Sequence, residues 1–292
     1  MRRTILAGLA ALALGAAPLG AVAQPASLPA AIFTDPPADA AHPPRMEVLH
    51  IPSGGVEING VAYLAGGAGA HPTVILLHGL PGNEKNLDLA QAIRRAGWNC
   101  VTFNYRGSWG SPGSYSFRGN LADAKAVLAY VRRPENAAKL QVDAGKLVIA
   151  GHSMGGWVTA MTAGSDPGLA GAVMISAADM GRLALAPEAQ RLATARDNME
   201  ALAGVTPESM AAEMATFGDV GFAQAAPGLA KTPLLVLTSD DGLAPMSDAL
   251  VADLKKRGDT RVTAIHEATD HSWSGRRIAL EADVISWLQG LR

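Results

Sequence analysis

Short, mostly apolar runs alternate with amphipathic segments along most of this chain. Such runs are typical of strands buried on both faces of a sheet, because a strand with one wet face alternates apolar and polar side chains. Strands that alternate with helices form a mostly parallel sheet. The pattern therefore predicts an α/β fold in which helices cover both faces of one central sheet. The predicted strands are residues 73–78, 99–105, 146–150, 171–176, 233–239 and 261–266.

The segments between these runs carry apolar residues at helical spacing. Asn120 is a suitable N-cap for the helix that it precedes. Ahead of the first run, residues 46–64 indicate two strands around a Pro-Ser-Gly-Gly turn. The predicted helices are residues 86–96, 120–132, 246–256 and 277–290 and the segment that follows Ser153.

Residues 177–231 interrupt this alternation. Helical patterns around 187–202 and 206–217 have no strand between them, which predicts a small helical cap inserted into the domain. Its four methionines are adaptable apolar side chains, suited either to lining a pocket or to packing the cap onto the body. They are Met180, Met199, Met210 and Met214.

The first 23 residues have the pattern of a signal peptide. Arg2 and Arg3 precede an apolar run over 5–19, and an A-x-A cleavage site ends at Ala23. We therefore expect the protein to be exported, to the periplasm or the extracellular medium.

The rest of the chain divides in two. Residues 24–45 are rich in Pro and Ala without apolar periodicity, which indicates a linker. Residues 46–292 then form the folded domain, with the cap inserted at about 177–231.

Composition and charge exclude several partners. The net charge of −2 offers no field for nucleic acid. Cys100 is the single cysteine and lies in a predicted strand, so we expect a buried thiol and no internal disulfide. The seven histidines form no ligand-spaced cluster with carboxylates, so neither a metal nor a cofactor is expected. No apolar run after the signal peptide could span a bilayer, so no membrane contact is expected after cleavage. The oligomeric state stays open.

The sequence Gly151-His152-Ser153-Met154-Gly155 stands between a predicted strand and a predicted helix. The backbone of a nucleophilic serine on such a strand–turn–helix elbow is strained, so the positions two before and two after it must be small. Gly151 and Gly155 meet that demand. The pattern predicts Ser153 as a nucleophile; the alternative is a structural turn in which Ser153 only caps the helix.

A serine hydroxyl becomes nucleophilic when a base takes its proton, and the base needs an orienting carboxylate. Asp240 and Asp241 follow one predicted strand, and His271 follows the next. The carboxyl ends of parallel strands share one edge of the sheet, where ligands bind. The order of Ser153, then an acid, then His271 is the order found on strand–turn–helix elbows.

Five stretches occur together in this chain: HGLPGN (78–83), NYRGSWGSPG (104–113), GHSMGG (151–156), TSDDGLAP (238–245) and DHSW (270–273). They resemble the α/β-hydrolase superfamily, most of all its prolyl-oligopeptidase-like and dienelactone-hydrolase-like members. The resemblance covers about 46–292 and implies an α/β-hydrolase fold and a serine hydrolase.

The resemblance also implies roles for single residues. In these families a proline usually stands four residues after the catalytic acid, which singles out Asp241, four before Pro245, over Asp240. Similarity to the H-G-x motif implies an oxyanion hole built from the backbone N–H groups of Leu80 and Met154.

Other polar residues near these motifs have simpler interpretations. We expect His78 to order the oxyanion loop, His152 to line the pocket, and His266 to be structural. Tyr105 or Arg106 could contact substrate, although an ion pair is the simpler role for Arg106.

The sequence favours hydrolysis of a small acyl ester through an acyl-enzyme. A peptidase, amidase or acyltransferase using the same three residues is the alternative, and a peptidase needs an acidic anchor for the substrate amine, for which Glu213 and Asp219 in the cap are candidates. A non-catalytic binding protein on the same fold is a further alternative.

Overall fold

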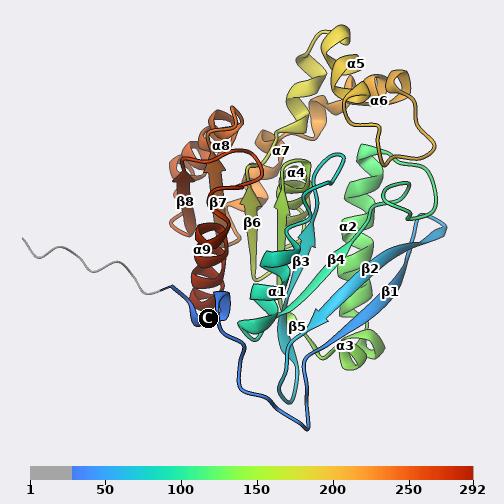
Figure 1. Ribbon diagram of the computed structural model, residues 1–292. Helices are drawn as coiled ribbons and strands as arrows, with labels where there is room; N and C mark the ends of the chain where they lie inside the picture. Colours follow the sequence, from blue (N-terminus) through green and yellow to red (C-terminus); the bar gives the residue numbers. More distant parts are fainter. Residues whose placement is uncertain (1–27, 292) are drawn as a thin grey trace, which may run out of the picture.

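The computed structural model describes residues 28–291 and is built around one eight-stranded sheet (Figure 1). The strand order is β1-β2-β4-β3-β5-β6-β7-β8, and β2 runs antiparallel to both its neighbours while the other pairs are parallel. The predicted mostly parallel α/β sheet is therefore confirmed. The strands are β1 (Arg45–Ser53), β2 (Val56–Leu64), β3 (His71–Leu77), β4 (Asn99–Phe103), β5 (Val142–His152), β6 (Gly171–Ile175), β7 (Leu234–Ser239) and β8 (Val262–Glu267).

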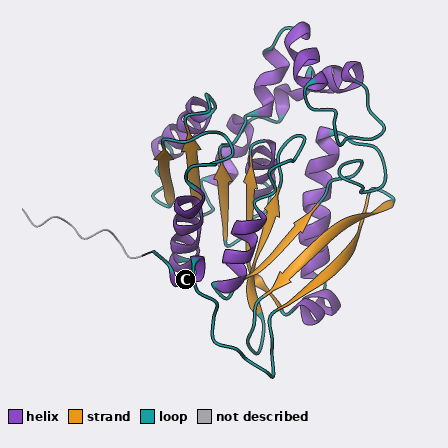
Figure 2. Cartoon of the chain, viewed as in Figure 1, coloured by secondary structure: helices purple, strands orange, loops and turns teal. Residues whose placement is uncertain are grey.

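Helices cover both faces of the sheet (Figure 2). One core lies between the sheet and α2, α4, α7 and α8, and a second, smaller core lies between the opposite face and α1 and α9. Cys100 is buried in the second core, as predicted. The helices outside the β6–β7 connection are α1 (Leu87–Arg95), α2 (Phe117–Arg132), α3 (Pro134–Leu140), α4 (Met154–Ala163), α8 (Ala244–Lys256) and α9 (Arg277–Gly290).

The edge strands differ from the expectation of full burial. β1 alternates exposed and less exposed side chains along its first half, and β8 has no fully buried residue. Both strands lie at the edges of the sheet. α2 packs against one face of β1, so buried and exposed side chains alternate along its second half. The central strands β3, β5, β6 and β7 are mostly buried, as predicted.

The N-cap prediction for α2 is wrong. Ser116 caps this helix, and its hydroxyl accepts a hydrogen bond from Gly119 N–H at 2.9 Å. Asn120 lies one turn further on, is buried, and donates from Nδ2 to the Tyr115 hydroxyl at 3.1 Å. Ser and Asn are both favourable N-cap residues. The Asn120 side chain is buried inside the fold, so Ser116 takes the cap position.

The connection between β6 and β7 contains helices and no strand, apart from an isolated β-bridge of Leu202 with Ser108. It contains η2 (Met180–Leu185), α5 (Glu188–Arg196), α6 (Pro207–Met214), η3 (Phe217–Asp219) and α7 (Phe222–Leu229). In Figure 1, α5 and α6 stand beyond the carboxyl ends of the strands. The last helix, α7, packs against α4 and α8 and so belongs to the layer that covers the sheet. Met210 and Met214 are buried in the larger core, so these methionines join the segment to the body.

The N-terminal part of the described chain lies against α1. Arg95 donates to the carbonyl oxygens of Ala31 and Ile32, at 2.5 and 3.1 Å, in the short helix η1 (Ala30–Ile32). The predicted signal peptide, 1–23, lies outside the described residues. Within 28–291, no helix has the length and apolar character needed to cross a membrane.

Candidate active site

Ser153 stands alone between the end of β5 and the start of α4, with a backbone that L-amino acids rarely adopt. Its φ is 59° and its ψ is −121°. Three backbone hydrogen bonds hold this conformation: Ser153 N–H donates to Ile175 O at 2.9 Å, and Ser153 O accepts from Gly156 and Ala178 at 3.0 and 3.1 Å. Strain of this kind persists only where the surrounding structure imposes it. The turn therefore has the geometry of a nucleophile elbow.

Glycines let the neighbouring chain approach this turn. A Cβ on Gly151 would lie 2.1 Å from Gly155 O, and one on Gly155 would lie 2.5 Å from Leu77 O. A Cβ on Gly79 would lie 2.9 Å from the Cβ of Ser153. Real Cβ atoms do not come this close to their neighbours, so the small residues expected around Ser153 are a steric requirement of the turn.

The structure brings Asp241 and His271 together from two loops. Nδ1 of His271 lies 2.7 Å from Oδ2 of Asp241, whose side chain is 3% exposed. Because a carboxylate only accepts hydrogen bonds, Nδ1 carries the proton and Nε2 retains a lone pair that can accept one. The adjacent Asp240 instead contacts Nε2 of His266 at 3.1 Å. Of the two candidate acids, Asp241 is thus the one beside His271.

The environment of Asp241 keeps it ionised. Burial favours the neutral acid, but hydrogen bonds from His271 and from the Leu243 N–H, at 2.8 Å, outweigh burial and lower the pKa of Asp241 below its usual range. An ionised carboxylate at this position can orient the His271 ring through their hydrogen bond.

Ser153 and His271 line a common cavity of about 160 Å³, together with Leu80 and His152. The hydrogen bonds of residues 28–291 do not include one from the Ser153 hydroxyl to His271. In serine hydrolases this bond often tightens only when substrate is bound. Ser153 and Leu80 also line a larger cavity of about 600 Å³ that extends toward η2 and α5.

The two predicted oxyanion donors stand beside this larger cavity. Leu80 and Met154 line it with Ser153, and within 28–291 neither backbone N–H donates a hydrogen bond. The Met154 side chain is buried, and its sulfur accepts from the Tyr115 hydroxyl at 3.2 Å and from Asn120 Nδ2 at 3.4 Å. Two unused N–H groups beside a serine can stabilise a negatively charged oxygen.

Two further histidines support the loops around the site. His78 Nδ1 donates to the Gly79 carbonyl at 2.8 Å, and His152 Nε2 donates to the His271 carbonyl at 2.8 Å. Burial is the main cause that lowers the pKa of each to about 4, so both are neutral at pH 7. His78 thus contacts the oxyanion loop, as expected. His152 lines the smaller cavity, as expected, and in addition holds the loop of His271.

Three other side chains are engaged elsewhere. Glu213 accepts from the N–H groups of Phe117 and Arg118 at the start of α2, at 3.1 and 2.9 Å, and Asp219 pairs with Arg118 at 2.6 Å. Both carboxylates therefore join the cap to the body, and neither lines one of the two cavities beside Ser153. Arg106 pairs with the buried Asp123 at 2.7 Å, which is the simpler of the two roles considered for it.

Sequence reasoning missed two charged residues that line the larger cavity, Asp179 and Arg182. Asp179 Oδ1 accepts from the N–H groups of Gly181 and Phe222, at 3.2 and 3.1 Å, so its role is at least partly structural. Within the described chain, the Arg182 guanidinium makes no hydrogen bond or ion pair. Asp179 follows the predicted strand 171–176 at its carboxyl end, which is the signal that could have found it.

Trp273, in the DHSW stretch, is a further missed residue. It is fully buried, has a φ of 59°, and donates from its indole N–H to the Ser176 hydroxyl at 2.9 Å. Its backbone N–H also closes a turn on Asp270 O at 3.0 Å. Trp273 thereby anchors the loop that carries His271.

Comparison with known proteins adds to this geometry. A family model described as "Alpha/beta hydrolase family" matches residues 74–284. A lysophosphatidylserine lipase of Danio rerio is 32% identical over 89 residues, which are 30% of this chain and 22% of the lipase. The match therefore spans about a fifth of that relative.

Solved structures share the fold over most of the chain. An esterase of Pyrobaculum calidifontis superposes with a TM-score of 0.60 at 23% identity, covering 87% of this chain and 88% of the esterase. An acylaminoacyl peptidase of Pyrococcus horikoshii superposes with a TM-score of 0.61 at 17% identity, covering 86% of this chain and 42% of the peptidase. At these identities the similarity concerns the fold alone.

Proposed function

The chain belongs to the alpha/beta hydrolase family, and from this premise we propose that it is a serine hydrolase that cleaves carboxylic esters through an acyl-enzyme on Ser153. One observation carries the proposal: His271, which is hydrogen-bonded to Asp241, shares a cavity with a serine in a strained turn. Nucleophile, base and orienting acid of this kind are the groups that acyl transfer requires.

In the first half of the reaction, Oγ of Ser153 attacks the ester carbonyl carbon while Nε2 of His271 takes the hydroxyl proton. Negative charge develops on the carbonyl oxygen, and the N–H groups of Leu80 and Met154 stabilise it. The ionised Asp241 stabilises the imidazolium ring. When the C–O bond to the alcohol breaks, His271 gives its proton to the leaving oxygen.

In the second half, water attacks the acyl-enzyme and gives a proton to His271. The bond to Ser153 breaks, its oxygen regains the proton from His271, and the carboxylic acid leaves. The second half reverses the proton transfers of the first, so the same five groups take part in both.

The cavity beside Ser153 supports a modest, partly apolar substrate. Leu80, Leu183, Leu243 and Met246 line it, and its volume of about 600 Å³ suits a small molecule. Arg182 adds a positive charge that has no ion-pair partner within 4 Å among the described residues, at a cavity that Asp179 also lines. We therefore expect esters that carry a carboxylate to be accepted as well as neutral ones.

A panel of model esters of increasing acyl length, assayed beside aminoacyl amides, tests the proposal. We expect kcat/KM to be measurable for short and medium acyl esters and much lower for amides. Hydrolysis of aminoacyl amides without hydrolysis of plain esters would contradict it and favour a peptidase. Absence of turnover on every substrate would favour a non-catalytic protein.

A further inference from the structure

The loop of residues 104–115 stands between the oxyanion loop and the cap. It follows β4 and carries Trp109 at its tip, with a φ of 49°. The larger cavity is lined by Leu80 from the oxyanion loop and by α5 residues from the cap. Contacts that join the oxyanion loop to the cap would therefore fix the position of the predicted donor Leu80.

The indole of Trp109 is bonded to the oxyanion loop. Its N–H donates to the carbonyl oxygen of Pro81 at 2.6 Å, one residue after the predicted donor Leu80. The ring of Trp109 also lies under the Lys85 ammonium, which is 4.5 Å from the ring centroid. The cation and the ring attract each other at this distance.

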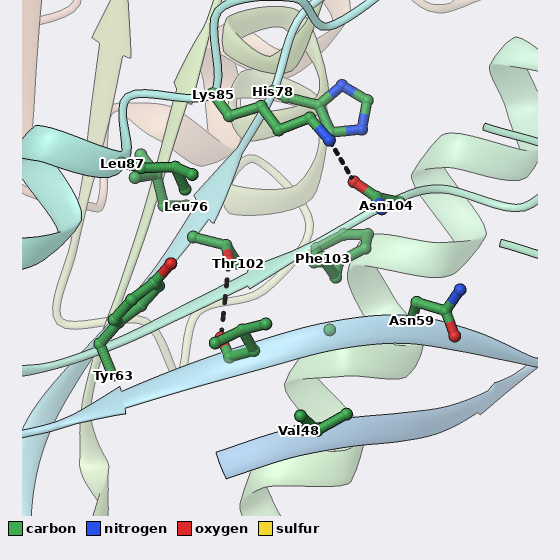
Figure 3. Close-up of a pocket in the computed structure, with 12 residues that line it drawn as sticks. Val48, Asn59, Tyr63, Leu76, His78, Lys85, Leu87, Thr102, Phe103 and Asn104 are labelled. Atoms are coloured by element: carbon green, nitrogen blue, oxygen red, sulfur yellow. Dashed lines mark hydrogen bonds between the residues drawn. The ribbon is translucent and has the colours of Figure 1, made fainter. Parts of the chain in front are cut away.

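Lys85 closes the connection from the other side. Its ammonium donates to Oδ1 of Asn104 at 3.0 Å, and Nδ2 of Asn104 donates to the Trp109 carbonyl at 3.1 Å. Figure 3 shows Lys85 reaching Asn104 with the His78 ring beside it. Lys85, Asn104 and His78 line a cavity of about 270 Å³, and Ser153, Asp241 and His271 are not among its lining residues.

The backbone of the same loop is bonded to the cap. Trp109 N–H donates to Ala201 O at 3.0 Å, Ala203 N–H donates to Gly107 O at 2.8 Å, and Tyr115 N–H donates to Ala203 O at 2.9 Å. Trp109 therefore contacts the cap through its main chain and the oxyanion loop through its side chain.

We propose that Trp109 is a positioning residue that holds Leu80 N–H at the oxyanion and couples this loop to cap residues 201–203. The inference rests on the proposed function, because it concerns the same oxyanion hole. Trp109 acts through Pro81 and does not touch the reacting atoms. Loss of the indole N–H frees the Pro81 carbonyl, and the N–H of Leu80 is then less well aligned with the developing charge.

Trp109→Phe keeps an aromatic ring and removes only the indole donor. We expect kcat/KM for a model ester to fall about tenfold, the effect of one neutral hydrogen bond. The affinity for an alkylboronic acid should fall by a similar factor, because the tetrahedral boronate formed on Ser153 places an oxygen in the oxyanion hole. Lys85→Met should also lower kcat/KM and the affinity for the boronic acid, because it removes the cation from the Trp109 ring and the donor to Asn104.

Trp287→Phe is the matched control, because within the described chain the indole N–H of Trp287 donates no hydrogen bond. This variant should keep the wild-type kcat/KM and the wild-type affinity for the boronic acid. Loss of melting temperature in Trp109→Phe with unchanged kcat/KM and boronate affinity would make the residue merely structural and overturn the proposal. Equal losses in Trp287→Phe would overturn it as well.

The coupling has its own measurement. In the wild type, boronic acid binding should slow amide hydrogen exchange at 78–86 and at 201–203; in Trp109→Phe the slowing at 201–203 should be lost. If boronic acid still slows amide hydrogen exchange at 201–203 in Trp109→Phe, the coupling is overturned. A wild type that neither turns over esters nor binds boronic acid would overturn the proposed function together with this inference, whereas an active wild type with an unaffected Trp109→Phe overturns this inference alone.

Discussion

Asp241 and His271 lie on different loops, after β7 and after β8, and are joined by a hydrogen bond of 2.7 Å between Oδ2 and Nδ1. The preceding residue, Asp240, contacts His266 instead. Two adjacent aspartates therefore contact two different histidines. This division follows from the parallel pairing of β7 with β8, which brings the ends of both strands to the same edge of the sheet.

The two aspartates form a natural pair of variants. Asp241→Asn should lower kcat by roughly a thousandfold to ten-thousandfold, because an amide cannot hold the imidazole in the required tautomer or stabilise its charge. Asp240→Asn should change kcat only slightly. Steady-state kinetics on one ester, with melting temperatures to verify folding, measures both. An equal loss in the two variants would contradict the assignment.

Arg182 provides a test of substrate charge. Arg182→Gln should lower kcat/KM for a carboxylate-bearing ester by about two- to fivefold, the effect of one solvent-exposed ion pair. A neutral ester of the same length should be unaffected, and Arg182→Lys should retain part of the preference. If both esters lose activity equally, Arg182 does not read substrate charge.

The close approach at the elbow predicts a loss of stability. Gly155→Ala places a Cβ 2.5 Å from Leu77 O, which should lower the free energy of unfolding by about 1–3 kcal/mol or more. Gly290→Ala is the control, because a Cβ there meets nothing within 4 Å. Urea denaturation of both variants gives the comparison, and a stable Gly155→Ala protein would show that the turn tolerates a side chain.

The buried histidines predict how stability depends on pH. His78 and His152 have folded-state pKa values of about 4, below the ordinary value of 6.5. Between these values the unfolded chain binds protons that the folded chain does not, so the free energy of unfolding should fall as pH drops from about 6.5 toward 4. In His152→Gln this dependence should be shallower. Denaturation midpoints of both proteins at several pH values measure this dependence. The same slope against pH in the wild type and in His152→Gln would contradict the prediction.

The site could be predicted from the sequence where local patterns determine it. Ser153 is marked by flanking glycines on a strand-to-helix turn, and Asp241 and His271 each follow an apolar run. Parallel strands bring the carboxyl ends of such runs to one edge, so their order along the chain predicts that they meet. The choice of Asp241 over Asp240 came from the family resemblance.

Contacts between distant segments could not be predicted in this way. Glu213 meets the start of α2, which lies 95 residues earlier at Arg118, and Trp109 meets Pro81 and Ala201. Asn120 was misjudged for the same reason, since it is buried against the Met154 sulfur, which comes from the start of α4.

The most direct test of the account is covalent labelling of Ser153 by a fluorophosphonate, read by intact mass. We predict one adduct on the wild-type protein, none on Ser153→Ala, and an unchanged adduct on Ser272→Ala, because Ser272 lines the same cavity but is not in the turn. No adduct on the wild type, or one that survives in Ser153→Ala, would contradict the assignment of Ser153 as the nucleophile.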